Sequence, residues 1–298
     1  MTAPTTQKVR SPLAQVTRRV LGYKGARIGL IFLFIVTGTA ILAPFVGFDA
    51  LTQNVSNLLQ PPSRQHWFGT DELGRDILAR TVHGARTSLF AAVGAVIIAS
   101  SVGVPIGLIA GFFAGWRDAV LMRIIDVMLA LPTILLAMAL IAVLGRSQTT
   151  ALIAVGVVGI PSFARITRAQ VLSLKNREYV TAVESMGGSS LYSMFRTVLP
   201  NSWSPILVQV VILASLAILL EAALAFLGLG VPPPTPSWGE MLRTGKSYLR
   251  DAPYYAVLPG IILTCTILSL DTLGRTLARV LEDRNEISPE VELEAGIA

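Results

Sequence analysis

The chain contains six long stretches that carry no charged residue, and these stretches constrain its fold more than any other feature. A helix needs about 20 apolar residues to cross the roughly 30 Å hydrocarbon core of a bilayer. Charged residues make up only 14% of the chain, whereas soluble proteins carry about 25%. The pattern predicts an all-α membrane protein with six transmembrane helices, over residues 28–48, 87–116, 127–145, 147–164, 197–220 and 252–270.

The segments between these runs predict which side of the membrane each one occupies. If all six runs cross, the segments on the N-terminal side hold more Lys and Arg than the segments on the other side. Cytoplasmic segments carry such an excess, so we expect both termini in the cytoplasm. The first run is longer than the apolar core of a signal peptide and no small-x-small site follows it, so we expect an uncleaved first helix.

One polar segment, residues 178–201, predicts two short helices separated by a glycine turn. Gly187 suits a helix end and Pro200 does not fit a helix interior. The second helix carries four apolar residues at spacing i, i+3, i+4 and i+7, namely Leu191, Met194, Phe195 and Val198. This apolar face predicts a partner surface, although a helix lying on the membrane surface would show the same pattern.

The same segment resembles the EAA loop of bacterial ABC-importer permeases, the cytoplasmic coupling segment that docks into a groove on an ATPase subunit. Thr181 stands where that family usually has Glu. Glu184 is acidic but lies three positions away, so we do not expect it to take the role of the family glutamate. The resemblance implies ATPase contacts through Thr181, Ala182, Val183, Gly187, Leu191, Met194, Phe195, Arg196, Leu199 and Pro200.

Further segments resemble the C-type permease subunits of dipeptide, oligopeptide and nickel importers. Residues 66–76 read HWFGTDELGRD, residues 221–239 read EAALAFLGLGVPPPTPSWG, and residues 271–284 resemble the closing segment of that family. By this resemblance Glu221 and Trp238 shape the outer mouth and contact another subunit. Asp71, Glu72, Arg75 and Asp76 are spaced for local ion pairs, and His66 belongs to no recognised set of metal ligands.

Acidic residues within or beside the apolar runs are few, and charge at membrane depth is costly. Asp126, Glu221 and Asp271 are therefore candidates for function by default. An ion-coupled secondary transporter or channel would need such midplane residues or inverted repeats, and we find no clear repeat. This class of transporter is the alternative function, and a scaffold without transport activity would leave the segment 178–201 unexplained.

The resemblance implies the type I ABC importer permease fold and a permease subunit that moves peptides across the cytoplasmic (inner) membrane. The chain has no GxxxxGK[ST] phosphate loop, so we predict no catalytic residue, metal or cofactor on it, with ATP and Mg in partner subunits. The implied partners are a second, B-type permease subunit, two ATPase subunits or domains, an extracytoplasmic solute-binding protein, the lipid bilayer and a peptide, with no nucleic acid.

The predicted organisation has four parts. They are a basic cytoplasmic tail over residues 1–27, a first helix and extracytoplasmic loop over 28–86, a five-helix permease core over 87–278 with its coupling loop at 172–201, and an acidic cytoplasmic tail over 279–298.

Overall fold

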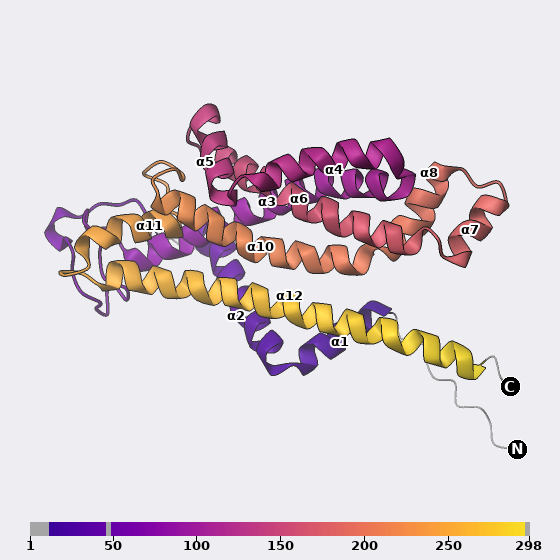
Figure 1. Ribbon diagram of the computed structural model, residues 1–298. Helices are drawn as coiled ribbons and strands as arrows, with labels where there is room; N and C mark the ends of the chain where they lie inside the picture. Colours follow the sequence, from indigo (N-terminus) through magenta and orange to yellow (C-terminus); the bar gives the residue numbers. More distant parts are fainter. Residues whose placement is uncertain (1–11, 46–48, 296–298) are drawn as a thin grey trace, which may run out of the picture.

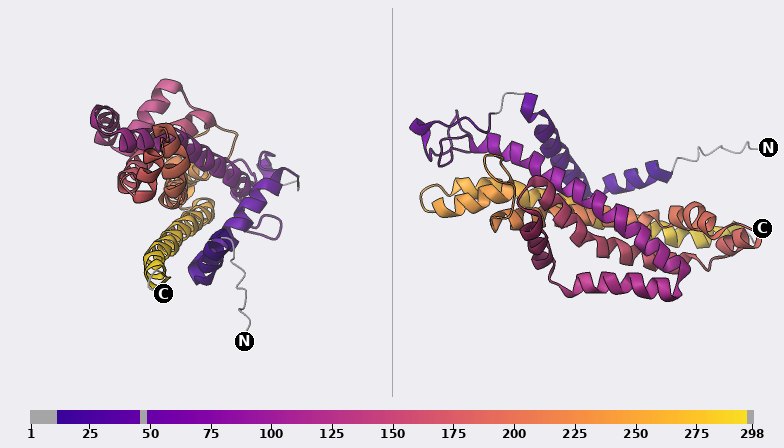
Figure 2. Two further views of the ribbon diagram at one scale, coloured as in Figure 1. Left: turned by 90° about the vertical axis from the view of Figure 1, so that its right-hand side faces the viewer. Right: turned by 90° about the horizontal axis from the view of Figure 1, so that it is seen from above.

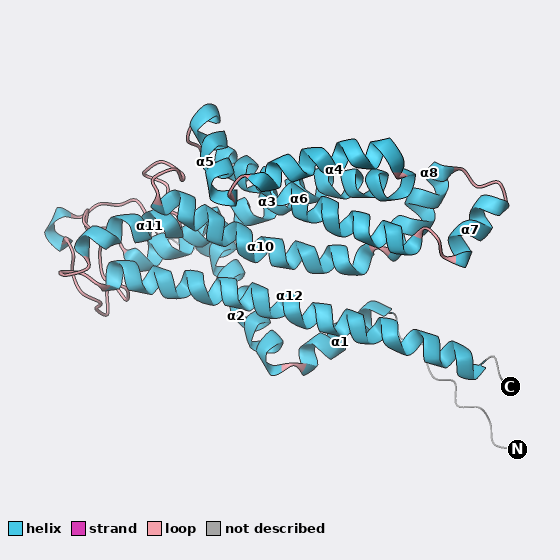
Figure 3. Ribbon diagram, in the orientation of Figure 1, coloured by secondary structure: helices cyan, strands magenta, loops and turns pink. Residues whose placement is uncertain are grey.

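The computed structural model describes residues 12–45 and 49–295, and the helices of these residues form an elongated bundle (Figure 1). Helices account for nearly all regular structure among the described residues, and loops are concentrated at one end of the bundle (Figure 3). The predicted all-α fold is confirmed. The elements are α1 (Pro12–Gly22), α2 (Lys24–Leu42), η1 (Ala43–Phe45), η2 (Val55–Asn57), α3 (Ile77–Phe113), α4 (Gly115–Ala130), α5 (Thr133–Leu144), α6 (Gln148–Leu174), α7 (Glu178–Ser185), α8 (Ser190–Tyr192), η3 (Ser193–Val198), α9 (Leu199–Asn201), α10 (Trp203–Phe226), α11 (Trp238–Gly245), η4 (Lys246–Tyr248) and α12 (Tyr254–Ala295).

Five of the described helices are long and apolar enough to cross a membrane, namely Lys24–Phe45 (α2 with η1), α3, α6, α10 and the part of α12 over Tyr254–Asp283. Helices α4 and α5 pass the same test only when taken together, and they give a sixth crossing if they form one broken span. The two are bent by 92° at the break between them, which lies inside the predicted run 127–145. At this break Leu131 adopts an extended backbone, which the ring of the following Pro132 favours sterically. Helices α3 and α6 continue through Pro105 and Pro161 without such a break.

Helix α3 begins at Ile77, well before the uncharged run that starts at residue 87. Its first turn is capped by Asp76, whose Oδ1 accepts a hydrogen bond from the Ala79 N–H at 2.8 Å. The charged residues Arg80 and Arg86 lie inside this helix, which is why a search for uncharged runs placed its start too late. Helix α12 likewise continues to Ala295, so residues 279–295 of the expected tail have a helical backbone.

Helices α3 and α6 pack closely because α3 presents glycines along one face. A Cβ atom built at Gly107 would lie 2.3 Å from the Ala164 carbonyl oxygen, and one at Gly103 would lie 2.6 Å from the Ile160 carbonyl oxygen. Small residues let membrane helices approach until their backbones touch. Buried side chains from α2, α3, α5, α6, α10, α11 and α12 then form the main apolar core, with Trp238 fully buried in it.

The bundle has two distinct ends. The "α7 end" carries residues 178–201, and both α1 and the end of α12 lie toward it (Figure 1). The "α11 end" carries residues 49–76 and 227–253. Across the bundle, α2 lies on the opposite side from α4 in all views (Figure 2). The expected basic tail includes residues 1–11, which lie outside the described residues, as do residues 46–48 and 296–298.

Candidate functional site

The segment between α6 and α10 begins with a short helix whose end is fixed by two glycines. Gly187 has a φ of +86°, a left-handed conformation that favours glycine. The Gly188 N–H then donates to the Val183 carbonyl at 2.9 Å, which is the capping bond of a Schellman motif. The glycine turn predicted from sequence is therefore present, and its cause is the backbone angle, because a Cβ at Gly187 would meet no atom within 4 Å.

A second helical stretch, Ser190 to Asn201, follows the turn. Its start is capped by Ser189, whose hydroxyl accepts a hydrogen bond from the Tyr192 N–H at 3.2 Å. The middle of the stretch, η3, has π-helical geometry, and α9 connects it to α10. The result is a helix, a turn and a second helix at the α7 end, as the sequence predicted.

Buried side chains attach this segment to the bundle. Met194 and Val198 are almost fully buried, as is Val180 of α7. They form one cluster with Leu108 of α3 and Val171 of α6. These contacts join both short helices to α3 and α6 near the ends of those two helices.

The predicted apolar face consists of two exposed and two buried residues. Leu191 is 60% exposed and Phe195 is 51% exposed, whereas Met194 and Val198 are buried against α3 and α6. Met194 and Val198 are thus covered by helices of this chain, which leaves Leu191 and Phe195 as the exposed part of the face on which docking contacts are predicted. The exposed apolar side chains of the segment, here called the "exposed apolar patch", are Tyr179, Met186, Leu191, Tyr192 and Phe195.

The other residues expected at this site lie on the same segment. Thr181 is exposed and its hydroxyl donates to the Glu178 carbonyl of its own helix at 3.0 Å. Val183 and Leu199 are partly buried. The exposed remainder consists of Ala182, Gly187, Arg196 and Pro200.

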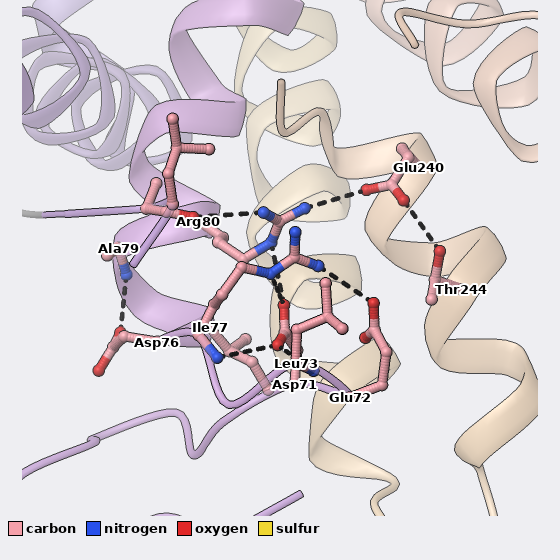
Figure 4. Close-up of polar contacts among 12 residues, drawn as sticks. Asp71, Glu72, Leu73, Asp76, Ile77, Ala79, Arg80, Glu240 and Thr244 are labelled. Carbon is pink, nitrogen blue, oxygen red and sulfur yellow. Dashed lines mark hydrogen bonds and ion pairs between the residues drawn. The ribbon is translucent and has the colours of Figure 1, made fainter. Parts of the chain in front are cut away.

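At the α11 end, a buried ion-pair network joins the loop before α3 and the first turn of α3 to α11, which is distant in sequence (Figure 4). Arg75 Nε donates to Asp71 Oδ2 at 2.6 Å, and its guanidinium also contacts Glu72 at 3.0 Å. Arg80 Nε lies 3.4 Å from the same Asp71 oxygen, and Arg80 also donates to Glu240 of α11 at 3.3 Å. The local pairs predicted among residues 66–76 are present, and Arg80 links them to α11.

The two outer-mouth candidates lie beside this network. The Trp238 indole N–H donates to the Thr81 carbonyl of α3 at 2.9 Å. Glu221 of α10 is 1% exposed, and its Oε2 accepts a hydrogen bond from the Ser88 hydroxyl at 2.8 Å. Both residues therefore connect α10 or α11 to α3 inside this chain, which is the structural role that their burial supports.

Two family profiles match the sequence. Residues 103–286 match the binding-protein-dependent transport system inner membrane component, and residues 11–62 match the N-terminal TM domain of oligopeptide transport permease C. The first match covers more than half of the chain, and its residues include the segment 178–201.

The chain belongs to the binding-protein-dependent transport permease family.

Individual relatives in this permease family are similar over most of their length. The chain is 41% identical to the di/tripeptide transport system permease protein DppC of Pseudomonas aeruginosa over 281 residues, or 92% of this chain and 93% of the relative. It is 40% identical to the dipeptide transport system permease protein DppC of Alkalihalophilus pseudofirmus, over 92% of this chain and 90% of the relative. It is also 40% identical to the oligopeptide transport system permease protein OppC of Bacillus subtilis, over 88% of this chain and 86% of the relative.

The family assignment confirms the predicted permease fold and places the chain in the inner membrane as a multi-pass subunit that works with other subunits. The alternative, an ion-coupled transporter or channel, is not supported. The remaining acidic candidates of this permease form ion pairs: Asp126 with Arg165 at 2.7 Å, and Asp271 with Arg275 at 2.7 Å. Among the described residues no group of three His, Cys, Asp or Glu is placed to hold a metal ion, and His66 contacts Asp76.

Sequence reasoning missed Arg80 and Glu240 as parts of the α11-end network. Arg80 was assigned to a polar loop, although its position inside α3 follows from the Asp76 cap. The pairing with Glu240, 160 positions away in sequence, has no local signal because it depends on how α11 packs against α3.

Proposed function

We propose that this chain is the C-type permease subunit of an ATP-driven peptide importer, and that its segment 178–201 is the site where an ATPase subunit docks. The exposed apolar patch carries this proposal. Its five large side chains lie on a segment that Val180, Met194 and Val198 hold to the bundle. An exposed apolar surface of this kind is typical of a protein–protein interface.

The orientation of the chain in the membrane follows from this proposed docking site. ATP is hydrolysed in the cytoplasm, so the α7 end faces the cytoplasm and the α11 end faces the outside. Both α1 and the end of α12 lie toward the α7 end, which agrees with an even number of crossings (Figure 1). This arrangement also agrees with the excess of basic residues expected on the cytoplasmic side.

The segment acts as a lever between the ATPase and the spans. Leu191 and Phe195 point outward to the partner, while Met194 and Val198 hold the same helix against α3 and α6. When the ATPase pair closes, the lever moves the ends of these spans. Transport then requires two packings of the bundle, one favoured by bound nucleotide and the other by its release.

The relatives support the substrate class. They are named as permeases for di- and tripeptides, dipeptides and oligopeptides. The substrate of this chain is accordingly a short peptide, delivered by an extracytoplasmic solute-binding protein to a path formed with a second permease subunit. Two ATPase subunits supply the energy, with ATP and Mg bound to them.

The test replaces Phe195 by Asp and measures how much ATPase subunit is retained when the tagged permease is purified. Removing a central apolar contact and burying a charge costs about 2 kcal/mol or more at an interface, so affinity should fall about thirtyfold. Peptide uptake should fall with it. The matched control is Leu249→Asp, since Leu249 is similarly exposed but lies in the loop after η4 at the α11 end.

Retention of the ATPase subunit should be unchanged in Leu249→Asp. Full retention and full uptake in Phe195→Asp would show that the exposed apolar patch is not the docking site. Competition of labelled dipeptide uptake by tetrapeptides separately tests the substrate class, and uptake that no peptide competes would exclude a peptide importer.

A further inference from the structure

A groove lies between α2 and α3 toward the α11 end, and neither the ATPase site nor the buried network uses it. Its volume is about 420 Å³. The lining residues are apolar except for Thr37 and one charged residue, Arg86. They are Thr37, Ala40, Ile41, Pro44, Phe45, Arg86, Leu89, Phe90 and Val93.

Arg86 occupies the end of this groove that is nearest the membrane surface. It is the last charged residue before the uncharged stretch of α3, and Pro44 and Phe45 mark the end of the apolar stretch of α2. From Arg86 to Val93, and from Phe45 to Thr37, the groove extends about 10–12 Å into the apolar band at 1.5 Å per residue. The charge therefore lies at the depth of lipid headgroups, and the groove lies at the depth of acyl chains.

Arg86 is also exposed, and its guanidinium forms no ion pair with any residue of the described ranges. It differs in this respect from Arg75 and Arg80 on the same side, which pair with Asp71. A guanidinium without a partner beside apolar walls is complementary to one kind of ligand, an anion that carries a long apolar chain.

We propose that this groove binds one anionic phospholipid, with the phosphate on Arg86 and an acyl chain between Ile41, Phe90 and Val93. All three apolar residues are more than half exposed in the chain alone. The bilayer around a multi-pass protein supplies the ligand at high concentration and in the required orientation. The bound lipid would fill the space between α2 and α3 and hold the first span against α3.

The experiment titrates the purified, delipidated full-length chain in neutral detergent with phosphatidylglycerol or phosphatidylcholine of the same chain length, and counts bound lipids by native mass spectrometry. One cation near an anionic headgroup contributes about 1 kcal/mol, so Arg86→Gln should weaken phosphatidylglycerol binding about fivefold. Arg86→Lys should retain most of the affinity. The matched control, Arg146→Gln, removes an exposed arginine outside the groove and should leave binding unchanged.

Two further measurements separate the possible occupants. Val93→Trp fills the groove while Arg86 remains, and it should weaken the binding of both lipids. Glycerol phosphate, which has the headgroup charge but no acyl chain, should not compete at millimolar concentration. The proposal is overturned if Arg86→Gln and Arg146→Gln weaken binding equally or not at all, or if glycerol phosphate competes. It is also overturned if the assembled transporter no longer binds phosphatidylglycerol there because a neighbouring subunit covers the groove.

Discussion

Replacing Arg80 by Met tests whether the buried network holds the α11 end together. Arg80 is 2% exposed, and its guanidinium lies within 3.4 Å of Asp71 and of Glu240 and donates to the Ala50 carbonyl at 3.3 Å. Met fills similar volume without the charge. Removing one partner of a buried ion pair costs about 3–5 kcal/mol, because the other charge is left without compensation.

The magnitude is expected near the lower limit of that range. Asp71 keeps Arg75 at 2.6 Å, whereas Glu240 keeps only the Thr244 hydroxyl at 2.9 Å and a longer contact with Arg243 at 3.9 Å. Glu240 is therefore the group that loses most. In the Arg80→Met background, Glu240→Gln should restore about 1–2 kcal/mol by removing the isolated charge.

The assay is equilibrium denaturation of the chain in mixed micelles of dodecyl maltoside and SDS, followed by tryptophan fluorescence. Trp238 is fully buried and hydrogen-bonded to Thr81 beside the network, so it provides a local probe once Trp67, Trp116 and Trp203 have been replaced by Phe in every variant. The two single variants and the double variant form a thermodynamic cycle with an expected coupling of at least 1 kcal/mol. Single effects that add within about 0.5 kcal/mol, or a loss below 1 kcal/mol for Arg80→Met, would refute the reasoning.

Two glycine substitutions test the local backbone arguments. Gly187→Val should destabilise the turn of segment 178–201 by about 1–2 kcal/mol because Gly187 has a positive φ, whereas Gly187→Asn should cost much less. Hydrogen exchange over residues 178–189 measures both effects. Equal protection in the two variants would contradict the prediction. Gly107→Leu should force α3 and α6 apart at a cost of at least about 1–3 kcal/mol and lower the melting temperature. Its control is Gly38→Leu, where no atom lies within 4 Å of an added Cβ, and similar melting temperatures for both would show that close α3–α6 packing does not limit stability.

The start of α3 shows how far sequence reasoning extended. Uncharged runs located the spans because an unpaired charge in hydrocarbon is costly, and this argument holds wherever the helix meets lipid. It failed at residues 77–86, where Arg80 is charged but compensated by Asp71 and Glu240 inside the protein. The same limit applies to α4, whose Asp118 and Asp126 pair with Arg168 and Arg165 of α6.

For segment 178–201, too, the sequence predicted the local structure but not which residues would be buried. Local chemistry decided its helix, glycine turn and second helix, because Gly187 and the Ser189 cap act through neighbouring backbone groups. Helical spacing also identified its apolar side, but spacing records only which residues share a face. It carries no information on which part of that face the ends of α3 and α6 will cover.

The sequence by itself determined that this protein is a bundle of membrane-spanning helices with a short helix pair over residues 178–201, since helix length, apolar content and turn residues are local properties. Only the tertiary structure decided that Met194 and Val198 hold this pair to the bundle while Leu191 and Phe195 remain exposed. It also decided that Arg80 meets Glu240. The physical reason is that burial and charge compensation depend on contacts between residues far apart in the chain, and these contacts exist only after the helices have packed.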